Sequence, residues 1–583
     1  MSKQLMLGNA ALARGLYEAG CAVASSYPGT PSTEITEELA KFDEIYCEWA
    51  PNEKVAMEAA FGAATAGKRS FCGMKHVGLN VAADPLFTIS YTGVNAGMVI
   101  VVADDAGMHS SQNEQDSRHY AIASKIPMLE PSDSAEALDF AKIAYELSEA
   151  YDTPVFIKMC TRIAHSQSIV ETHDRIEPPE KPYVKDITKS VMLPGNAKRR
   201  HPLVEARTRS LSDYACNAPF NRIEWGGTDL GIITSSTSYQ YAKEVFGDSV
   251  SILKLGMVFP LPDKLILEFA GKVKSLAVLE ELDPIIEDHC RSLGLEVHGK
   301  DLLPVEDEYS QNIIAEAFGK EPHAGKKLEE PLPSRPPAMC AGCPHRGIYY
   351  LLAKHKCTVF GDIGCYSLGA TAPLFAVDVS ICMGGSVSGI HGYNKALGEA
   401  AEKKTVAVIG DSTFMHSGMT GLANIAYNQS NSTVIILDNS ITGMTGHQQN
   451  PTTGYNIKGD PAGKIDLESL CRAMGISRVR VVDPYDLQEC EQALLEEMAA
   501  PEPSVIISRR PCALLKYVKH NPPLTVCRDS CRKCRACMKL GCPAISMKDG
   551  KAHIDKTLCV GCGVCMQLCR FSAIHKQDLP QAQ

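Results

Sequence analysis

The sequence predicts an α/β protein of several domains with parallel sheets, followed by a small cysteine-rich domain at the C-terminal end. Its 583 residues suffice for about four domains, and 45% hydrophobic with 22% charged residues is typical of folded chains. Short apolar runs alternate with helix-like segments over most of the chain, a pattern that favours parallel sheets. In addition, 9 of the 23 cysteines fall between Cys527 and Cys569.

Residues 1–175 form the first predicted α/β domain. A helix-like stretch at 54–66 is followed by strand candidates at 98–102 and 154–157. These candidates are short and mostly apolar, as expected for strands buried on both faces of a parallel sheet. From 176 to 228 the pattern changes to Pro, Lys, Arg and Asn, so we expect a linker or excursion there.

Three further blocks complete the predicted organisation. A second α/β domain is expected at 229–330, and a Pro-rich stretch separates it from a third at 335–515. The last block, 521–583, is too small to form a sufficient core alone, so we expect bound metal to stabilise it. The strand candidates of the second domain are residues 230–234, 251–255 and 276–279.

Charge and hydropathy narrow the classes of partner. The net charge of −10 does not indicate a broad phosphate-binding surface, so nucleic acid is not an expected partner. The longest apolar runs, such as residues 96–103, are about half of the ~20 residues that cross a bilayer. The N-terminus lacks the basic region, apolar stretch and cleavage site of an export signal. We therefore expect a cytoplasmic protein with no membrane partner.

The cysteine-rich tail has a spacing that indicates metal ligation rather than disulfides. A two-residue spacing lets three thiolates bind three irons of one cubane, and in the bacterial two-cluster arrangement the fourth cysteine of each run binds the other cluster. The runs resemble those of bacterial two-cluster ferredoxins. They are Cys531-x2-Cys534-x2-Cys537-x4-Cys542-Pro543 and Cys559-x2-Cys562-x2-Cys565-x3-Cys569.

This resemblance implies two 4Fe-4S clusters in a ferredoxin-like domain. Two zinc knuckles are the alternative, although two runs of three cysteines exceed what tetrahedral zinc needs. Cys527 is expected to be a free thiol. The first cluster would be bound by Cys531, Cys534, Cys537 and Cys569, and the second by Cys542, Cys559, Cys562 and Cys565.

The tail is also basic. From Pro511 to the end the chain has 12 Lys and Arg against 4 Asp and Glu. Clusters with four thiolates are anionic, so these cations either offset them locally or steer an acidic electron-carrier protein toward them. Both interpretations fit the sequence.

Polar residues follow two neighbouring strand candidates in the third domain. The apolar run 405–409 ends in Gly410-Asp411-Ser412, and the run 433–437 ends in Asp438-Asn439. The carboxyl ends of parallel strands meet at one edge of a sheet, where ligands of α/β proteins bind. Two hard oxygen ligands suit Mg²⁺, and glycine permits close approach of a diphosphate. An ordinary strand-to-helix turn is the alternative.

The same segments resemble the diphosphate motif of thiamine enzymes. The resemblance implies that the side chains of Asp411 and Asn439 and the carbonyl of Ile441 bind Mg²⁺. Gly410 and Ser412 would then belong to the cofactor site.

Thiamine enzymes also require a carboxylate from a separate domain. It forms a hydrogen bond with the aminopyrimidine ring and promotes deprotonation of the thiazolium carbon. The segment Asn52-Glu53-Lys54-Val55-Ala56-Met57-Glu58 resembles the family's, which assigns this catalytic role to Glu53. Without the resemblance, Glu53 would be an N-terminal helix carboxylate stabilised by the helix dipole.

Further segments resemble the 2-oxoacid:ferredoxin oxidoreductases, and over the whole chain the large subunits of their indolepyruvate branch. They occur in one order over residues 27–569. They are Tyr27-Pro28-Gly29-Thr30-Pro31-Ser32, Lys75-His76-Val77-Gly78-Leu79-Asn80, Cys340-Ala341-Gly342-Cys343-Pro344-His345-Arg346, Gly361-Asp362-Ile363-Gly364-Cys365-Tyr366 and Thr442-Gly443-Met444-Thr445-Gly446-His447-Gln448.

The family resemblance implies a role for each predicted domain. Residues 1–175 would bind the pyrimidine, 335–515 would bind the diphosphate and Mg²⁺, and 229–330 would resemble the C-terminal domain of transketolase. Thr30 becomes a candidate for contacting the 2-oxoacid carboxylate, or else its hydroxyl satisfies a Pro-rich turn. His76 and His416 would face the same pocket, or each is a satisfied structural histidine.

Four other cysteines match positions that bind a cluster near thiamine in the pyruvate and 2-oxoglutarate branches. A third cluster is therefore a hypothesis beside the alternative of two clusters alone. The four are Cys340, Cys343, Cys365 and Cys512.

The resemblance implies oxidative decarboxylation of an aryl 2-oxoacid of the indolepyruvate or phenylpyruvate type. Coenzyme A would take the acyl group, CO2 would leave, and ferredoxin would accept the electrons. A smaller beta subunit and an α2β2 assembly are the expected partners. Three alternatives remain: the same chemistry on phenylglyoxylate, a branched 2-oxoacid or pyruvate; a non-oxidative decarboxylase; and an electron-transfer subunit without catalysis.

Overall fold

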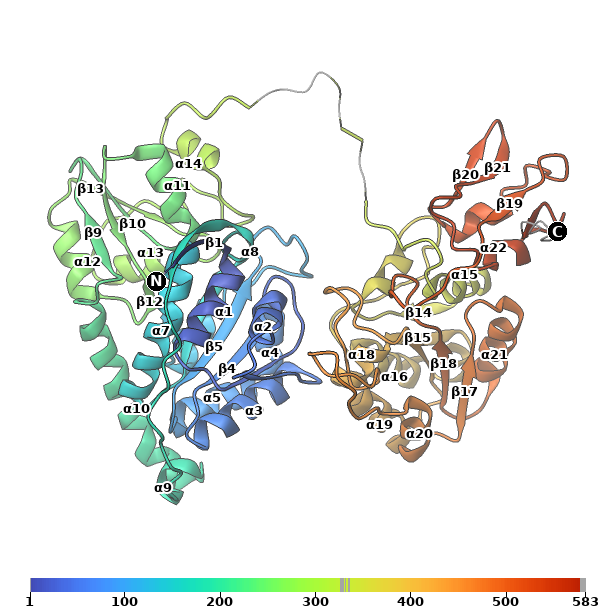
Figure 1. Cartoon of the computed structure of the whole chain (residues 1–583), viewed down its shortest axis with the longest axis horizontal. Helices are drawn as coiled ribbons and strands as arrows, with labels where there is room; N and C mark the ends of the chain where they lie inside the picture. Colours follow the sequence, from blue (N-terminus) through green and yellow to red (C-terminus); the bar gives the residue numbers. More distant parts are fainter. Residues whose placement is uncertain (1, 326–329, 331, 334–335, 577–583) are drawn as a thin grey trace. The chain divides into compact units, whose positions relative to one another are not determined.

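The computed structural model describes residues 2–325, 330, 332–333 and 336–576. The chain divides into two compact units, Met1–Glu329 and Glu330–Gln583 (Figure 1). Each unit contains at least one parallel sheet, as the alternation of apolar runs and helix-like segments predicts. Among the described residues, no helix is both long and apolar enough to span a bilayer.

A seven-stranded sheet forms the centre of the first unit. Its order is β12-β6-β7-β5-β4-β2-β3, and every neighbouring pair is parallel except β12 with β6. All residues of β5 are buried, because helices such as α1, α3 and α7 cover the sheet (Figure 1). The strands are β2 (Val23–Ser26), β3 (Tyr46–Trp49), β4 (Ser70–Lys75), β5 (Met98–Asp104), β6 (Met128–Leu129), β7 (Val155–Cys160) and β12 (Met257–Phe259).

The helices around this sheet follow the strands in the order expected of an α/β domain. An antiparallel pair, β1 (Ser2–Leu7) with β8 (Gln167–Thr172), joins the two ends of the domain. The helices are α1 (Gly8–Glu18), α2 (Thr33–Leu39), α3 (Glu53–Thr65), α4 (His76–Val81), α5 (Ala83–Thr92), α6 (Arg118–Ser124), α7 (Ser134–Tyr151) and α8 (Thr161–His165).

A second sheet in the first unit has the order β13-β10-β11-β9, with only β9 antiparallel. The strand predictions at 230–234, 251–255 and 276–279 are confirmed to within one residue at each end. The block 229–330 also supplies β12 to the first sheet, a pairing the sequence did not indicate. The elements are β9 (Arg222–Glu224), β10 (Leu230–Thr234), β11 (Ser251–Lys254), β13 (Ser275–Leu279), α11 (Ser236–Phe246), α12 (Asp263–Ala270), α13 (Ile285–Ser292) and α14 (Gln311–Ala317).

The segment 176–228, expected to be a linker or excursion, is partly helical. It contains α9 (Ile187–Ser190) and the 22-residue α10 (Pro194–Ala215), and it ends in β9 of the second sheet. Two of its basic residues satisfy the last carbonyl groups of α5. Arg200 Nε donates to the Tyr91 carbonyl at 2.7 Å, and Arg207 Nη2 donates to the Ser90 carbonyl at 3.1 Å. Such unpaired carbonyls at a helix end favour cationic donors.

The second unit is built on a five-stranded, all-parallel sheet of order β14-β15-β16-β18-β17. The strand predictions 405–409 and 433–437 are confirmed, each with one residue added. The strands are β14 (Thr358–Phe360), β15 (Thr405–Gly410), β16 (Thr433–Asp438), β17 (Arg478–Val482) and β18 (Ser504–Arg509). The helices are α15 (His345–His355), η1 (Cys365–Ala370), α16 (Gly385–Leu397), α17 (Glu399–Glu402), α18 (Asp411–Thr413), η2 (Phe414–Gly418), α19 (Met419–Tyr427), α20 (Leu467–Ala473) and α21 (Leu487–Ala499).

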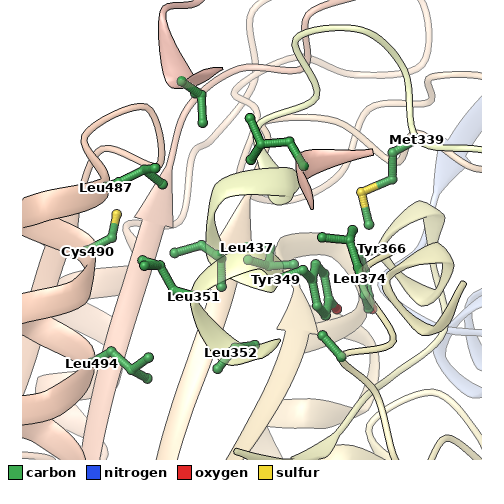
Figure 2. Packing of buried hydrophobic residues seen from close by; sticks show 14 of the residues in the cluster. Met339, Tyr349, Leu351, Leu352, Tyr366, Leu374, Leu437, Leu487, Cys490 and Leu494 are labelled. Atoms are coloured by element: carbon green, nitrogen blue, oxygen red, sulfur yellow. The ribbon is translucent and has the colours of Figure 1, made fainter. Parts of the chain in front are cut away.

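The cysteine-rich block shares a hydrophobic core with this sheet. One cluster of buried residues includes Leu437 of β16 and Leu494 of α21 together with Leu540 and Ile574 of the C-terminal block. Figure 2 shows the central part of this cluster, where α15 and α21 contribute their apolar faces. The C-terminal elements are β19 (Leu524–Val526), η3 (Ala536–Leu540), β20 (Ile545–Lys548), β21 (Lys551–Ile554), α22 (Val564–Gln567) and β22 (Ile574–Lys576).

Candidate functional site

Three oxygen atoms converge at the carboxyl ends of β15 and β16. The parallel register aligns Gly410 with Leu437, so Asp411 and Asn439 emerge side by side. The side-chain oxygen of Asn439 lies 3.3 Å from Asp411 Oδ1 and 2.7 Å from the Ile441 carbonyl oxygen. The reversed amide orientation would turn these contacts into hydrogen bonds, so a bound cation or an amide flip accounts for them. The structure therefore brings together Asp411, Asn439 and the Ile441 carbonyl, the three groups predicted to bind Mg²⁺.

This trio suits a hard divalent cation. Asp411 is 2% exposed, and burial together with the nearby Asp438 raises the pKa of its carboxyl to about 8. A cation would offset the cost of that buried negative charge. A carboxylate, an amide oxygen and a backbone carbonyl are ligands that Mg²⁺ accepts. The charge of Asp438 is instead paired with Arg509, whose Nε donates to it at 2.8 Å.

The residues around the trio have roles that the sequence did not indicate. A Cβ atom at Gly410 would lie 2.7 Å from Cε1 of Tyr366, so this glycine makes room for the tyrosine ring. Ser412 Oγ accepts a hydrogen bond from Thr442 Oγ1 at 2.9 Å. Buried Asp362 accepts hydrogen bonds from Gly384 and Ser386 backbone amides at the start of α16.

Glu53 is the first residue of α3 and is 5% exposed. Asn52 is the N-cap, and its side chain accepts a hydrogen bond from the Val55 amide at 2.9 Å. Gly78 of α4 faces the Glu53 side chain: an added Cβ would lie 2.4 Å from Glu53 Oε1. Gly78 belongs to the motif that begins at Lys75, but only the tertiary contact reveals that it accommodates Glu53.

Thr30 and His76 lie at the carboxyl ends of the neighbouring strands β2 and β4. Thr30 lies within a turn from Gly29 to Ser32, in which the backbone amide and hydroxyl of Ser32 both donate to the Gly29 carbonyl at 2.8 Å. His76 is 1% exposed, its Nδ1 has no partner among the described residues, and burial lowers its pKa.

Lys75 is a candidate that we did not single out from the sequence. It ends β4, is 8% exposed, and packs against Gly29, where an added Cβ would lie 3.0 Å from Lys75 Cβ. Its Nζ donates to the Ser110 carbonyl at 2.8 Å, and burial lowers its pKa to about 8 despite the nearby Asp105. The sequence did contain a signal for Lys75, because a lysine at the end of a buried strand is uncommon and indicates a specific role.

His416 belongs to the other unit. It lies in the π-helical turn η2, is 4% exposed, and its Nδ1 is 2.5 Å from Ser417 Oγ. His345 is closer to the oxygen trio: its Nε2 is 3.5 Å from Asn439 Nδ2, and burial lowers its pKa to about 4. A neutral His345 therefore lies beside the candidate Mg²⁺ ligands.

The eight tail cysteines line two separate hollows in the C-terminal block. Each hollow contains three cysteines of one run and the fourth cysteine of the other, which is the crossed arrangement implied by the resemblance to two-cluster ferredoxins. Among the described residues, no group of three His, Cys, Asp or Glu side chains could hold a single metal ion. The first hollow is lined by Cys531, Cys534, Cys537 and Cys569, and the second by Cys542, Cys559, Cys562 and Cys565.

A third group of cysteines lies near the oxygen trio. The thiol of Cys365 interacts electrostatically with those of Cys340 and Cys512, and burial raises its pKa to about 11. Cys343 interacts with Cys340 and Cys365. The backbone amide of Cys512 donates to the Asn439 carbonyl at 2.9 Å, which connects this group to the candidate Mg²⁺ site.

Family profiles match three parts of the chain. Residues 362–508 match "Thiamine pyrophosphate enzyme, C-terminal TPP binding domain", and residues 14–210 match "Pyruvate flavodoxin/ferredoxin oxidoreductase, thiamine diP-bdg". Residues 552–575, which contain the second cysteine run, match "4Fe-4S binding domain". Fold, site and profiles together define a thiamine diphosphate-dependent iron–sulfur oxidoreductase.

Curated relatives specify the family. Proteins named indolepyruvate oxidoreductase subunit IorA are 39% identical in Archaeoglobus fulgidus and 40% identical in Pyrococcus horikoshii, each covering 98% of this chain and 97% of the relative. The chain therefore belongs to the indolepyruvate oxidoreductase IorA family, and it is a 2-oxoacid:ferredoxin oxidoreductase. A 2-oxoglutarate synthase subunit KorA from Methanocaldococcus jannaschii is 28% identical over 33% of this chain and 57% of its own.

Among solved structures, a 2-oxoglutarate:ferredoxin oxidoreductase from Magnetococcus marinus aligns with 54% of this chain and 65% of its own. The TM-score is 0.46 and the sequence identity is 19%.

Proposed function

We propose that this chain is the large subunit of an enzyme that oxidatively decarboxylates aryl 2-oxoacids of the indolepyruvate or phenylpyruvate type. Coenzyme A is the proposed acyl acceptor, and the products are CO2 and an arylacetyl-CoA. The aryl specificity is supported by relatives named for indolepyruvate over nearly the whole chain.

One observation carries the oxidative part of the proposal. The oxygen trio of Asp411, Asn439 and Ile441 and both cysteine-lined hollows belong to the same compact unit. Moreover, one hydrophobic core joins the sheet that carries the trio to the C-terminal block. A decarboxylase that released an aldehyde would need no electron acceptors held beside its cofactor site.

The residues have the following proposed roles. Asp411, Asn439 and the Ile441 carbonyl bind Mg²⁺, which binds the diphosphate. Glu53 holds a proton in a hydrogen bond to the aminopyrimidine ring. Thr30 and His76 contact the 2-oxoacid from neighbouring strand ends. When bound, thiamine diphosphate supplies the electron sink for decarboxylation, and the clusters accept electrons singly.

An acidic ferredoxin is the proposed electron acceptor. Among the eight tail cysteines, Cys534 is the exposed one, and it lies in the first hollow. The rim of that hollow carries Arg532, Lys533 and Arg535, which are exposed and have no ion pair among the described residues. Unpaired cations beside an exposed ligand favour an encounter with a negatively charged carrier.

A smaller beta subunit, an α2β2 assembly and a third cluster complete the proposal. The word "subunit" in the names of the relatives supports a partner chain. The third cluster is supported by the proximity of Cys340, Cys343, Cys365 and Cys512. After anaerobic reconstitution, three clusters would give about 12 irons per chain, whereas two would give about 8.

The decisive experiment uses anaerobic protein reconstituted with the small subunit, thiamine diphosphate, Mg²⁺, iron and sulfide. Indolepyruvate and then coenzyme A are added while the iron–sulfur absorbance is followed, and the products are identified by mass spectrometry. Bleaching with formation of indoleacetyl-CoA supports the proposal. Dithionite must bleach the same sample, which controls for intact clusters.

Other outcomes identify the alternatives. Turnover of phenylglyoxylate, a branched 2-oxoacid or pyruvate, with none of indolepyruvate, would leave the chemistry intact but overturn the aryl specificity. Release of an aldehyde without bleaching would indicate a non-oxidative decarboxylase. Bleaching by dithionite alone, in protein that binds no thiamine diphosphate, would indicate an electron-transfer subunit.

A further inference from the structure

Arg346 is a buried cation between two cysteine-containing segments of the second unit. It is the second residue of α15 and is 5% exposed. Its Nη1 donates to the Leu540 carbonyl at 2.7 Å, and its Nη2 donates to the carbonyls of Met339 at 2.5 Å and Cys340 at 3.1 Å. The guanidinium thereby connects the segment before α15 to the end of η3 in the C-terminal block.

These contacts give the guanidinium neither a counter-ion nor an acceptor for its Nε. All three acceptors are neutral carbonyls, and among the described residues no carboxylate pairs with Arg346. Its buried Nε also has no hydrogen-bond acceptor among the residues that the structure describes. A buried charge without a counter-ion and a buried donor without an acceptor both destabilise the folded protein. An anion beside Arg346 would supply both the counter-ion and the hydrogen-bond acceptor for Nε.

Arg346 lies at the second cysteine-lined hollow. Arg346 lines it together with Cys542, Cys559, Cys562 and Cys565. The Cys340–Cys343 segment also reaches the hollow, because a Cβ added at Gly342 would lie 2.1 Å from Val560 Cγ2. Four thiolates and a cubane carry a net negative charge and present sulfur atoms that accept hydrogen bonds.

We infer that Arg346 is a positioning and redox-tuning residue of the cluster bound by Cys542, Cys559, Cys562 and Cys565. Its charge compensates the cluster, and its Nε donates a hydrogen bond to a sulfur of the cluster or of one ligand. The inference rests on the proposed function, since it requires a cluster in the second hollow.

The expected consequence concerns reduction of that one cluster. Reduction adds a negative charge, and a nearby buried cation favours the reduced form. Removing the cation should therefore make the second cluster harder to reduce. The first cluster, in a separate hollow that Arg346 does not line, should keep its potential.

The test compares wild-type holoenzyme with R346K, R346Q and the control R472Q in EPR-monitored redox titrations. The control Arg472 also donates to backbone carbonyls, those of Ser477 and Val479, but it is exposed, is paired with Glu468 and lines neither hollow. In R346Q the ratio of reduced to oxidised second cluster at a fixed potential should fall about tenfold, which is about 59 mV for one electron. R346K should fall between wild type and R346Q.

A second measurement starts from wild-type protein. Pulsed EPR of reduced wild-type protein with ¹⁵N-labelled arginine should show a weak coupling of one guanidinium nitrogen to the second cluster, and R346K should lack it. Unchanged potentials in R346Q with full iron content, or no nitrogen coupling in wild type, would overturn the inference. Wild-type protein without any cluster would instead contradict the proposed function.

Discussion

A Cβ atom added at Gly78 would lie 2.4 Å from Oε1 of Glu53 and 2.7 Å from its carboxyl carbon. Gly78 is on α4 and Glu53 begins α3, so the glycine gives the buried carboxylate its space. Any larger residue at position 78 must displace the carboxylate or shift the helix, because contacts below 3.0 Å do not occur for real Cβ atoms. The position of Glu53 thus depends on a residue that has no reactive group.

We therefore predict that G78A lowers turnover by about 100-fold, as expected for a displacement of about 1 Å at a reacting group. E53Q should abolish turnover, and both variants should keep the wild-type iron content. The matched control is G62A, because Gly62 is on the same helix as Glu53 and an added Cβ would meet nothing within 4 Å. G78A turning over at the wild-type rate would contradict this account of Glu53.

Asp411 is predicted to be indispensable for Mg²⁺-dependent binding of thiamine diphosphate. D411N removes the one charged ligand of the oxygen trio, so the affinity should fall by at least the roughly 10- to 100-fold that outer-shell changes cause. N439D keeps an oxygen at the second position and should retain most of the affinity. Calorimetric titration of the diphosphate, with and without Mg²⁺, measures both; equal affinities of D411N and wild type would remove Asp411 from the site.

Reversing charges on the rim of the first hollow should weaken the encounter with an acidic carrier. The double variant K533E/R535E is expected to raise the KM for ferredoxin severalfold at low salt, and the difference should shrink as salt is added. The rate of reduction by dithionite should change less, because it does not require protein docking. K404E, which alters an exposed lysine away from both hollows, is the control. Equal KM values for both variants would argue against docking at this rim.

The first unit should lose stability in acid partly through Glu149. This carboxylate accepts hydrogen bonds from Arg69 Nε at 2.9 Å and Nη2 at 3.0 Å, and it pairs with Lys181 at 2.9 Å. Burial opposes ionisation, but these cations outweigh it and lower the pKa from 4.5 to about 2. Because the folded pKa is the lower one, the stabilisation is present above about pH 4.5 and is lost as the pH falls toward 2.

E149Q should consequently have a lower Tm than wild type at pH 7, and the difference should narrow below about pH 4.5 and vanish as the pH falls toward 2. Thermal unfolding followed by circular dichroism at several pH values measures this. A difference in Tm that stays constant down to pH 3 would show that the effect of the substitution is not electrostatic.

Buried strands were the elements best predicted from sequence. The strands β10, β15 and β16 are uninterrupted apolar, β-branched runs, because they are buried on both faces of parallel sheets. The segment 176–228, expected to be a linker or excursion, contains the helix α10, whose arginines satisfy the carbonyl groups at the end of α5 in another part of the chain. Composition does not indicate such long-range donors.

The sequence by itself determined the family, the two cysteine runs, the pair Asp411 and Asn439, and the candidate Glu53. These signals are local, because ligand spacing and strand ends are fixed by a few consecutive residues. Only the tertiary structure decided that Gly78 accommodates Glu53, that Gly410 accommodates Tyr366, and that Arg346 lies beside the second hollow. Each of these relationships depends on close packing between residues distant in sequence, and no local pattern encodes it.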